Sequence, residues 1–290
     1  MKKIGKYLKD ILIMILLSFG KNRKVGCIPI LLYHSINNND KPPVYSVRLT
    51  NFEQQLKYLK KKKYVSINVN QLHDFLYNKV DLPKKSFMIT FDDGFNDNFE
   101  AIIMAKKYGF NSVLFLATSF VGRRYNFIPF QGNLSSNGTK MSTKSTKIAF
   151  LSIDELINLR DIGTDICPHT HTHIDLTESV KDKQREDILM SVKWIKDNLK
   201  IDSTCFCYPY GKYNENSIEV LKELNIELGF AVSDGMNTKF TSPYKIQRRN
   251  VWDTNKKIHI KLLLSTKYSA YKRISTWILK KNKINDGKNA

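Results

Sequence analysis

Short apolar runs alternate with longer amphipathic stretches along most of this chain. Runs of three to six residues are typical of buried strands, which we expect at 28–33, 86–91, 112–116, 165–167, 204–208 and 228–232. Apolar residues at helical spacing predict helices near 71–77 and over 98–108, 153–160, 181–199 and 216–224. A further helix is expected to begin after Thr50, with this residue as its N-cap. Residues 131–147 follow neither period and are expected to form a loop. The repeated alternation predicts an α/β fold with a parallel sheet or a barrel of βα units.

The N-terminal segment contains an apolar run, Ile11 to Leu17, between clusters of lysine and arginine. The run is shorter than the roughly 20 residues that span a bilayer, and no small-residue cleavage site of a signal peptide follows it. We therefore expect a basic amphipathic helix that lies on a membrane surface, with the cytoplasmic face favoured. The alternative is an uncleaved signal anchor, with the rest of the chain exported.

The net charge of +20 is concentrated at the two ends of the chain. Residues 1–24 carry +6 and residues 256–290 carry +9, which leaves +5 for the residues between them. Basic ends of this kind suit anionic lipid headgroups better than specific nucleic-acid binding, and solubility alone is the other explanation. We expect a basic and apolar segment at 1–26, one catalytic domain at 27–255, and a basic amphipathic helix and tail at 256–290.

Four cysteines, at positions 27, 167, 205 and 207, follow no spacing that is typical of a zinc knuckle or a disulfide framework. Cys205 and Cys207 lie two apart in an expected strand, on one face, where they are poorly placed to bond each other. The sequence therefore indicates a reducing compartment or buried free thiols.

Acidic and histidine side chains follow the ends of several expected strands, where the chemistry of such folds is usually found. Asp92 and Asp93 close one strand, and His169 and His173 follow another. Two adjacent buried carboxylates repel each other unless they share a cation or a proton. One carboxylate with two imidazoles leaves coordination positions open for water and substrate, which suits zinc or a neighbouring divalent transition metal.

Three strings together resemble those of the metal-dependent polysaccharide deacetylases, the NodB-homology or carbohydrate esterase family 4 proteins. They are TFDDG at 90–94, HTHTH at 169–173 and CYPYG at 207–211. The string LYHS at 32–35 and a late R-x-x-V at 248–251 are similar to the branch that contains poly-N-acetylglucosamine deacetylases. The resemblance implies a distorted (β/α) barrel and a hydrolase that removes N-acetyl groups from amino sugars of a polysaccharide or a lipid-linked glycan.

The resemblance also implies a role for each matching residue. Asp93, His169 and His173 would bind one divalent metal, with Zn²⁺ expected first and Co²⁺, Mn²⁺ or Ni²⁺ as alternatives. Asp92 would be the general base that takes a proton from the attacking water. The backbone N–H of Tyr210 would stabilise the oxyanion of the attacked acetamide.

This chain departs from the family pattern at two points. Many members have an arginine beside the base, where this chain has Cys207, and we expect Arg248 to supply the missing charge. The late histidine motif that usually provides the general acid is not recognisable, which makes His34 our candidate to protonate the leaving amine. Tyr208 is a further candidate for contact with a sugar ring.

Two other classes of function compete with this interpretation. One is a non-catalytic glycan- or membrane-binding protein on a decayed deacetylase fold, and the other is an O-acetyl or peptidoglycan-directed hydrolase. The expected partners are an N-acetylated glycan and an anionic membrane surface, without a specific nucleic acid.

Overall fold

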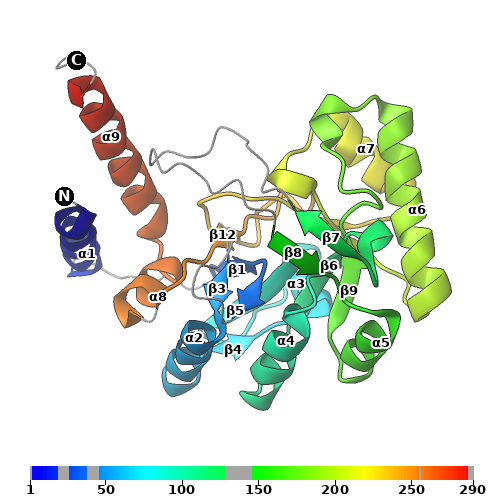
Figure 1. Cartoon of the computed structure of the whole chain (residues 1–290), viewed down its shortest axis with the longest axis horizontal. Helices are drawn as coiled ribbons and strands as arrows, with labels where there is room; N and C mark the ends of the chain where they lie inside the picture. Colours follow the sequence, from blue (N-terminus) through cyan, green and yellow to red (C-terminus); the bar gives the residue numbers. More distant parts are fainter. Residues whose placement is uncertain (1, 19–25, 38–45, 128–145, 255, 287–290) are drawn as a thin grey trace.

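A parallel β-sheet forms the centre of the computed structural model, which describes residues 2–18, 26–37, 46–127, 146–254 and 256–286 (Figure 1). Five strands pair in the order β12–β1–β5–β6–β9, and β4 pairs with β5 beside this path. Their bounds are β1 Ile30–Tyr33, β4 Val65–Ser66, β5 Ser86–Asp93, β6 Val113–Leu116, β9 Asp165–Pro168 and β12 Arg249–Asn250. Because all these ladders are parallel, the carboxyl ends of the strands meet at one edge.

A second parallel pair, β10 (Cys205–Cys207) and β11 (Leu228–Phe230), is joined to this sheet on one side. The N–H of Ala231 donates to the carbonyl oxygen of Ile246 (2.8 Å), and the N–H of Ser233 donates to that of Arg248 (3.0 Å), directly before β12. The strands therefore curve into a ring. Of the steps around this ring that the structure describes, the one from β9 to β10 has no backbone hydrogen bonds.

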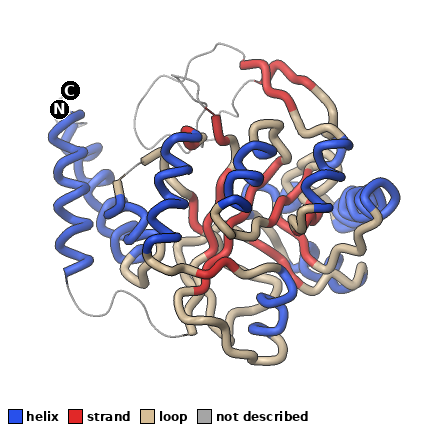
Figure 2. The backbone as a smooth tube through the Cα atoms, turned by 90° about the horizontal axis from the view of Figure 1, so that it is seen from below, coloured by secondary structure: helices blue, strands red, loops and turns tan. Residues whose placement is uncertain are grey.

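Helices surround the strands, as Figure 2 shows. They are α2 (Leu49–Lys61), α3 (Val69–Leu76), α4 (Asn98–Lys107), α5 (Ile153–Asp161), α6 (Lys181–Leu199) and α7 (Glu215–Glu223). Each covers a predicted helix to within about two residues at its ends, as expected for boundaries set by fraying and capping. Their apolar faces bury side chains such as Leu56 and Leu59 of α2 against the sheet, which accounts for the helical spacing in the sequence.

The predicted N-cap of the first of these helices is wrong. Helix α2 begins at Leu49, with Arg48 in the N-cap position, so Thr50 lies inside the helix. The carboxylate of Asp253 accepts a hydrogen bond from the backbone N–H of Arg48 (3.0 Å) and one from the side chain of Asn51. An acid about 200 positions away thus binds the chain at the start of α2, where a local hydroxyl was expected to cap the helix.

Six short strands and three 3₁₀ turns were not predicted, and two of these strands, β4 and β12, belong to the central sheet. β2 (Ile36–Asn37) pairs in parallel with β3 (Val47–Arg48), and β7 (Arg124–Phe127) pairs antiparallel with β8 (Thr146–Ala149). The 3₁₀ turns are η1 (Thr118–Phe120), η2 (Leu176–Glu178) and η3 (Pro209–Gly211). The expected loop at 131–147 lies outside the described residues except for its last two, which belong to β8.

The two ends of the chain lie side by side against the same face of the domain (Figures 1 and 2). They form α1 (Lys2–Ser18), α8 (Lys257–Leu263) and α9 (Tyr268–Asp286). Ile13 and Leu17 of α1 are buried in the same apolar cluster as Tyr268 and Tyr271 of α9 and the outer face of the sheet. The described helices include none that is both long enough and apolar enough to cross a membrane.

Arg249 fastens the C-terminal helices to the sheet. Its guanidinium donates to the carbonyl oxygens of Gly235 (2.7 Å), Leu263 (2.6 Å) and Ser265 (2.8 Å), and it lies over the ring of Tyr268. Burial lowers the pKa of Arg249 to about 10. The guanidinium thereby provides a donor for the carbonyl group of Leu263, the last residue of α8.

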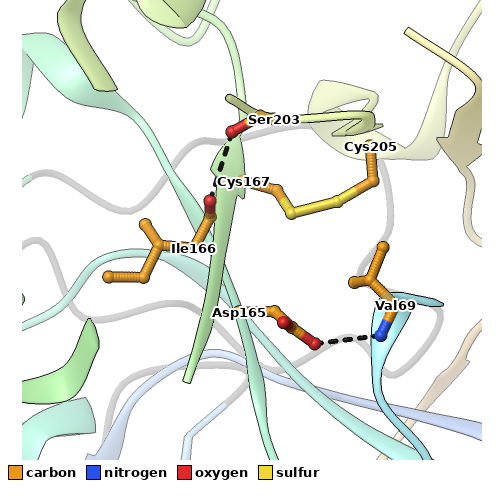
Figure 3. Close-up of a disulfide and its surroundings, with 6 residues drawn as sticks. All are labelled: Val69, Asp165, Ile166, Cys167, Ser203 and Cys205. Atoms are coloured by element: carbon orange, nitrogen blue, oxygen red, sulfur yellow. Dashed lines mark hydrogen bonds between the residues drawn. A yellow bond between two sulfur atoms is a disulfide. The ribbon is translucent and has the colours of Figure 1, made fainter. Parts of the chain in front are cut away.

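The expectation of free thiols is wrong for two of the four cysteines. Cys167 of β9 and Cys205 of β10 form a disulfide, although 38 positions separate them in the sequence (Figure 3). The spacing could not predict this bond, because it depends on two strands that become neighbours only in the folded ring. Cys27 and Cys207 have free thiols, and that of Cys207 is buried.

Candidate active site

Asp92 and Asp93 end β5 at the carboxyl edge of the sheet. Neighbouring side chains in a regular strand point to opposite faces, but Asp93 departs from this geometry with a φ of 74°, and Gly94 follows with 81°. A Cβ on Gly94 would lie 2.5 Å from Cδ1 of Leu116, so only glycine fits here without displacing its neighbour. The turn leaves Asp92 buried, whereas Asp93 is partly open to solvent.

Asp92 forms a bidentate ion pair with Arg248. The Nη1–Oδ1 and Nη2–Oδ2 distances are 2.6 and 2.8 Å, and Nη2 also lies 2.8 Å from Sγ of Cys207. Burial acts to raise the pKa of Asp92, but the charge of Arg248 outweighs it and holds this pKa below its ordinary value. The structure thus brings Arg248 to the carboxylate for which the sequence predicted a missing charge.

His169 and His173 both turn toward Asp93. Their Nε2 atoms lie 3.5 and 3.2 Å from Oδ1 of Asp93, yet this buried oxygen makes no hydrogen bond of normal geometry with the described residues. Nδ1 of His169 lies 2.8 Å from the carbonyl oxygen of Cys207, which can only accept, so Nδ1 donates this hydrogen bond and Nε2 is the ring nitrogen that faces Asp93. Burial acts to raise the pKa of Asp93, but the two imidazoles outweigh it and hold the pKa well below its ordinary value.

These three side chains fit a divalent metal. Their ligand atoms all lie within 4.8 Å of one another, and an oxygen that lacks a hydrogen bond faces two imidazole nitrogens. A second group of possible ligands, Asp92, His169 and Cys207, satisfies the same distance limit. It fits less well, because Arg248 occupies the Asp92 carboxylate and burial raises the pKa of the Cys207 thiol well above its ordinary value.

The loop that carries the histidines is held by an acid that the sequence did not reveal. Oδ1 of Asp187, a buried residue of α6, accepts hydrogen bonds from the backbone N–H groups of His171 (2.6 Å) and Thr172 (3.1 Å). Nδ1 of His171 lies 2.8 Å from Oγ1 of Thr118, away from Asp93, which separates His171 from the two candidate ligands. An aspartate within a helical pattern gives no local signal for this contact.

His34 follows β1 at the same edge of the sheet. Tyr33 pairs with Phe91, so His34 is in register with Asp92 on the neighbouring strand. Burial and closer groups have the larger effects on the pKa values of Asp92 and Asp93. The imidazole of His34 makes a smaller contribution, which lowers both pKa values. The side-chain amide of Asn98 donates to the carbonyl oxygen of His34 (2.6 Å) and holds the backbone at this position.

Tyr210 lies at the rim of the site, in the turn η3. Its ring is 46% exposed, and the ring centroid is 4.8 Å from that of His173. Tyr208 is fully buried instead, and its hydroxyl donates to the carbonyl oxygen of Tyr244 (3.0 Å). The predicted sugar contact of Tyr208 is therefore wrong, because no ligand reaches its ring.

Four of the nine non-glycine residues with a positive φ in the described part of the chain lie at this site. Asp93, Thr170, His173 and Tyr210 have φ values between 58° and 74°, in the left-handed region that side chains other than glycine rarely adopt. Each such residue costs on the order of 1–3 kcal/mol unless its surroundings compensate. The fold thus holds two of the three candidate ligands and the rim tyrosine in conformations that short peptides avoid, which is typical of a functional site.

Comparison of the sequence with known families agrees with this geometry. The family model described as polysaccharide deacetylase matches residues 79–229, just over half of the chain. The poly-β-1,6-N-acetyl-D-glucosamine N-deacetylase of Staphylococcus aureus (strain MRSA252) is 27% identical over 243 residues, which cover 80% of this chain and 76% of that protein.

Two solved structures share the fold over most of their length. The Streptococcus pyogenes deacetylase PplD in complex with acetate has a TM-score of 0.67 and 22% identity, over 84% of this chain and 99% of that one. IcaB from Ammonifex degensii has a TM-score of 0.67 and 19% identity, over 83% of this chain and 98% of that one. These similarities confirm the expected α/β fold with a distorted barrel.

Proposed function

The chain belongs to the polysaccharide deacetylase family, and from this premise we propose that it is a metal-dependent hydrolase that removes N-acetyl groups from amino sugars of a glycan and releases acetate. One arrangement carries the proposal: Oδ1 of Asp93 faces the Nε2 atoms of His169 and His173. The ionised carboxylate of Asp92 lies next to this group. A metal site beside a general base is a combination that can hydrolyse a stable amide.

We assign each step of the proposed reaction to a particular group of the site. A divalent ion bound by Asp93, His169 and His173 would polarise the acetamide carbonyl and make water more acidic. Asp92 takes the proton of the attacking water, and Arg248 keeps this carboxylate ionised and oriented. We assign stabilisation of the oxyanion to the backbone N–H of Tyr210, a contribution typically worth about 10²–10³ in rate.

We assign the final proton transfer to His34. Cleavage of an amide expels a poor leaving group unless its nitrogen gains a proton as the bond breaks. His34 comes level with Asp92 on the adjacent strand, so the acid and the base would act from neighbouring positions. The hydrogen bond from Asn98 to the backbone of His34 supports this placement.

Release of acetate from N-acetylglucosamine oligomers tests the proposal. We expect the full chain to lose this activity on treatment with a chelator and to regain it with Zn²⁺, Co²⁺, Mn²⁺ or Ni²⁺. Asp93→Asn should abolish the activity. His171→Gln should retain it, because this histidine of the same loop contacts Thr118 and not Asp93. Release that survives both chelation and Asp93→Asn would contradict a metal-dependent mechanism.

The same assay separates the competing functions. Acetate from O-acetylated but not from N-acetylated sugars would indicate an esterase, and release from peptidoglycan fragments alone would indicate a cell-wall substrate. Binding of the oligomers without release would indicate a non-catalytic glycan-binding protein. Activity on a lipid-linked N-acetylhexosamine and not on a soluble polymer would support the lipid-linked substrate.

We further propose that α1 and the C-terminal helices hold the enzyme on an anionic membrane surface. Helix α1 is apolar on two sides: Ile13 and Leu17 are buried, whereas Ile11, Met14 and Ile15 are 46%, 52% and 48% exposed. A helix that is apolar all round is usually covered on every side, by protein or by lipid. In the described residues, protein covers only the side that carries Ile13 and Leu17.

Two contacts of Asp10 fix the rotation of α1. The carboxylate of Asp10, on the inward side, binds Nε2 of His259 (2.8 Å) and the ammonium group of Lys256. Burial acts to raise the pKa of Asp10, but hydrogen bonds from Lys256 and His259 outweigh it and keep this pKa below its ordinary value. The apolar outward face therefore stays directed away from the domain.

Basic side chains border this outward face. A pocket of about 460 Å³ lies between α1, α2 and α8, with Met14 and Ile258 in its lining and Lys62, Lys257 and Lys261 around them. Lysines around an apolar floor match the phosphate and the acyl chain of an anionic lipid. Trp277 of α9 is 61% exposed, and tryptophan is enriched where proteins meet the headgroup region.

Sedimentation with lipid vesicles tests this surface. We expect the full chain to bind vesicles of phosphatidylglycerol and phosphatidylcholine, and Met14→Glu/Ile15→Glu to bind them at least about tenfold more weakly, because two apolar side chains no longer enter the lipid. Leu189→Glu/Met190→Glu, which changes two exposed apolar residues of α6, is the matched control and should bind normally. Equal binding by both variants would exclude α1 as the contact.

A further inference from the structure

One step of the strand ring lacks a backbone ladder, and it runs through the candidate site. β9 pairs with β6 and β10 pairs with β11, but no backbone hydrogen bond joins the described residues of β9 to those of β10. The chain after β9 carries His169, and the chain after β10 carries Tyr210. A contact other than the ladder must therefore hold these two sides of the site at a fixed separation.

Side-chain contacts take the place of the ladder along this seam (Figure 3). At one end, Oγ of Ser203 donates to the carbonyl oxygen of Ile166 (3.3 Å). In the middle, the disulfide joins Cys167 to Cys205, whose Cα atoms are 5.9 Å apart. Both cysteines are at most 4% exposed, so the bond is part of the core.

The next contact along the seam belongs to the site itself. His169 and Cys207 each come two residues after one of the bonded cysteines. Nδ1 of His169 lies 2.8 Å from the carbonyl oxygen of Cys207, the contact that directs Nε2 toward Asp93. The disulfide is therefore one side-chain step away from the hydrogen bond that orients a candidate metal ligand.

We propose that the Cys167–Cys205 disulfide is a positioning element of the active site, which holds His169 in register with the β10 strand and so maintains metal affinity. The proposal rests on the proposed function in one respect, that His169 is a metal ligand. Reduction takes up two electrons and two protons and converts the bond into two thiols, without any other change in the chain. Of the contacts named above, the hydrogen bonds of Ser203 and His169 then remain.

This role makes the metal affinity of the enzyme dependent on the redox conditions of its compartment. Disulfides persist in oxidising compartments, whereas cytosolic thiols such as glutathione supply the electrons and protons that open them. The disulfide therefore favours the exported topology over the cytoplasmic face for the catalytic domain. On the cytoplasmic side the same chain would have the weaker metal site.

Thiol counting and metal titration together test the proposal. The full chain, alkylated under denaturing and non-reducing conditions directly after acid quenching of the producing cells, should gain two labels by mass spectrometry, at Cys27 and Cys207. Zn²⁺ titration against a competing indicator should then give roughly 10- to 100-fold weaker binding for Cys167→Ala/Cys205→Ala, the range found when groups that orient a ligand are removed. Cys27→Ala, which removes a cysteine outside the seam, should bind Zn²⁺ like the parent.

A second measurement covers the case in which the double variant folds poorly. The parent chain, reduced and then freed of reductant, should lose Zn²⁺ affinity by the same factor and recover it on reoxidation. Four labelled cysteines in the quenched cells, or equal Zn²⁺ affinity of the oxidised and reduced parent, would overturn the proposal. A parent chain with the disulfide intact that binds no Zn²⁺, Co²⁺ or Mn²⁺ would instead overturn the proposed function itself, and the positioning role with it.

Discussion

Arg248 binds both carboxylate oxygens of Asp92, although 156 positions separate the two residues in the sequence. The pair is buried, next to the group formed by Asp93, His169 and His173. A carboxylate in such surroundings would otherwise tend to take up a proton and could then no longer act as a base. The buried guanidinium thus prepares Asp92 for its proposed role.

Removal of this charge should disable the base. We expect Arg248→Gln to lower kcat for acetate release by about 10²–10⁴, the usual contribution of a general base. Loss of one partner of a buried ion pair should also lower the free energy of unfolding by about 3–5 kcal/mol, measured in urea. Arg185→Gln, which removes a half-exposed arginine 3.5 Å from Glu223, should leave both quantities nearly unchanged. Normal turnover by Arg248→Gln would refute the role.

Removal of the proposed general acid should slow the reaction by a factor that depends on the leaving group. We expect His34→Ala to slow acetate release from N-acetylglucosamine oligomers by about 10²–10⁴ but to spare an aryl acetate, whose phenolate leaves without a proton. His73→Ala, on the exterior helix α3, is the control. Equal losses on both substrates would instead assign His34 to binding or folding.

The histidine loop should depend on Asp187. We expect Asp187→Ala to lower the free energy of unfolding by roughly 1–3 kcal/mol, because the N–H groups of His171 and Thr172 lose their acceptor. Affinity for Zn²⁺ should fall as well, since His173 belongs to the same loop. Glu186→Ala, which breaks only an exposed pair with Lys183, should change neither. An Asp187→Ala protein of normal stability and affinity would show that the loop holds its shape by other means.

A comparison of two glycines can separate the cost of a strained backbone from the cost of steric overlap with a neighbouring side chain. Gly94 and Gly122 both have a positive φ, of 81° and 70°, but only at Gly94 would an added Cβ meet a neighbour, Leu116. We expect Gly94→Ala to destabilise the protein by roughly 1–3 kcal/mol more than Gly122→Ala, the usual cost of an overpacked core. Thermal unfolding of the two variants measures the difference. Similar melting temperatures would mean that Leu116 moves aside at little cost.

The periodicity of the sequence predicted most elements of the fold, because strands and helices bury their apolar faces against one another. It also placed acids and histidines at strand ends that meet at one edge, and the resemblance to a known family then singled out Asp93, His169 and His173 as the candidate ligands. What it missed depends on contacts between distant segments. Asp253 binds the chain at the start of α2, and the disulfide joins strands that become neighbours only when the ring forms.

One error came from assigning a side chain by its residue type alone. Tyr208 and Tyr210 are alike in the sequence, but the first is buried and the second is half-exposed. The change of backbone at Tyr210, with a φ of 60°, turns the chain between them. A left-handed residue other than glycine is hard to anticipate from sequence, because its conformation is imposed by the surrounding structure.

Elemental analysis of the purified full chain, beside Asp93→Asn and His171→Gln, tests the central claim most directly, because it needs no assumption about the sugar. We predict about one divalent metal per chain in the parent and in His171→Gln, and none in Asp93→Asn, since three protein ligands are the usual complement of a catalytic zinc site. A parent chain that holds no metal after incubation with Zn²⁺, Co²⁺, Mn²⁺ or Ni²⁺, or one that keeps its metal in Asp93→Asn, would contradict the proposed site.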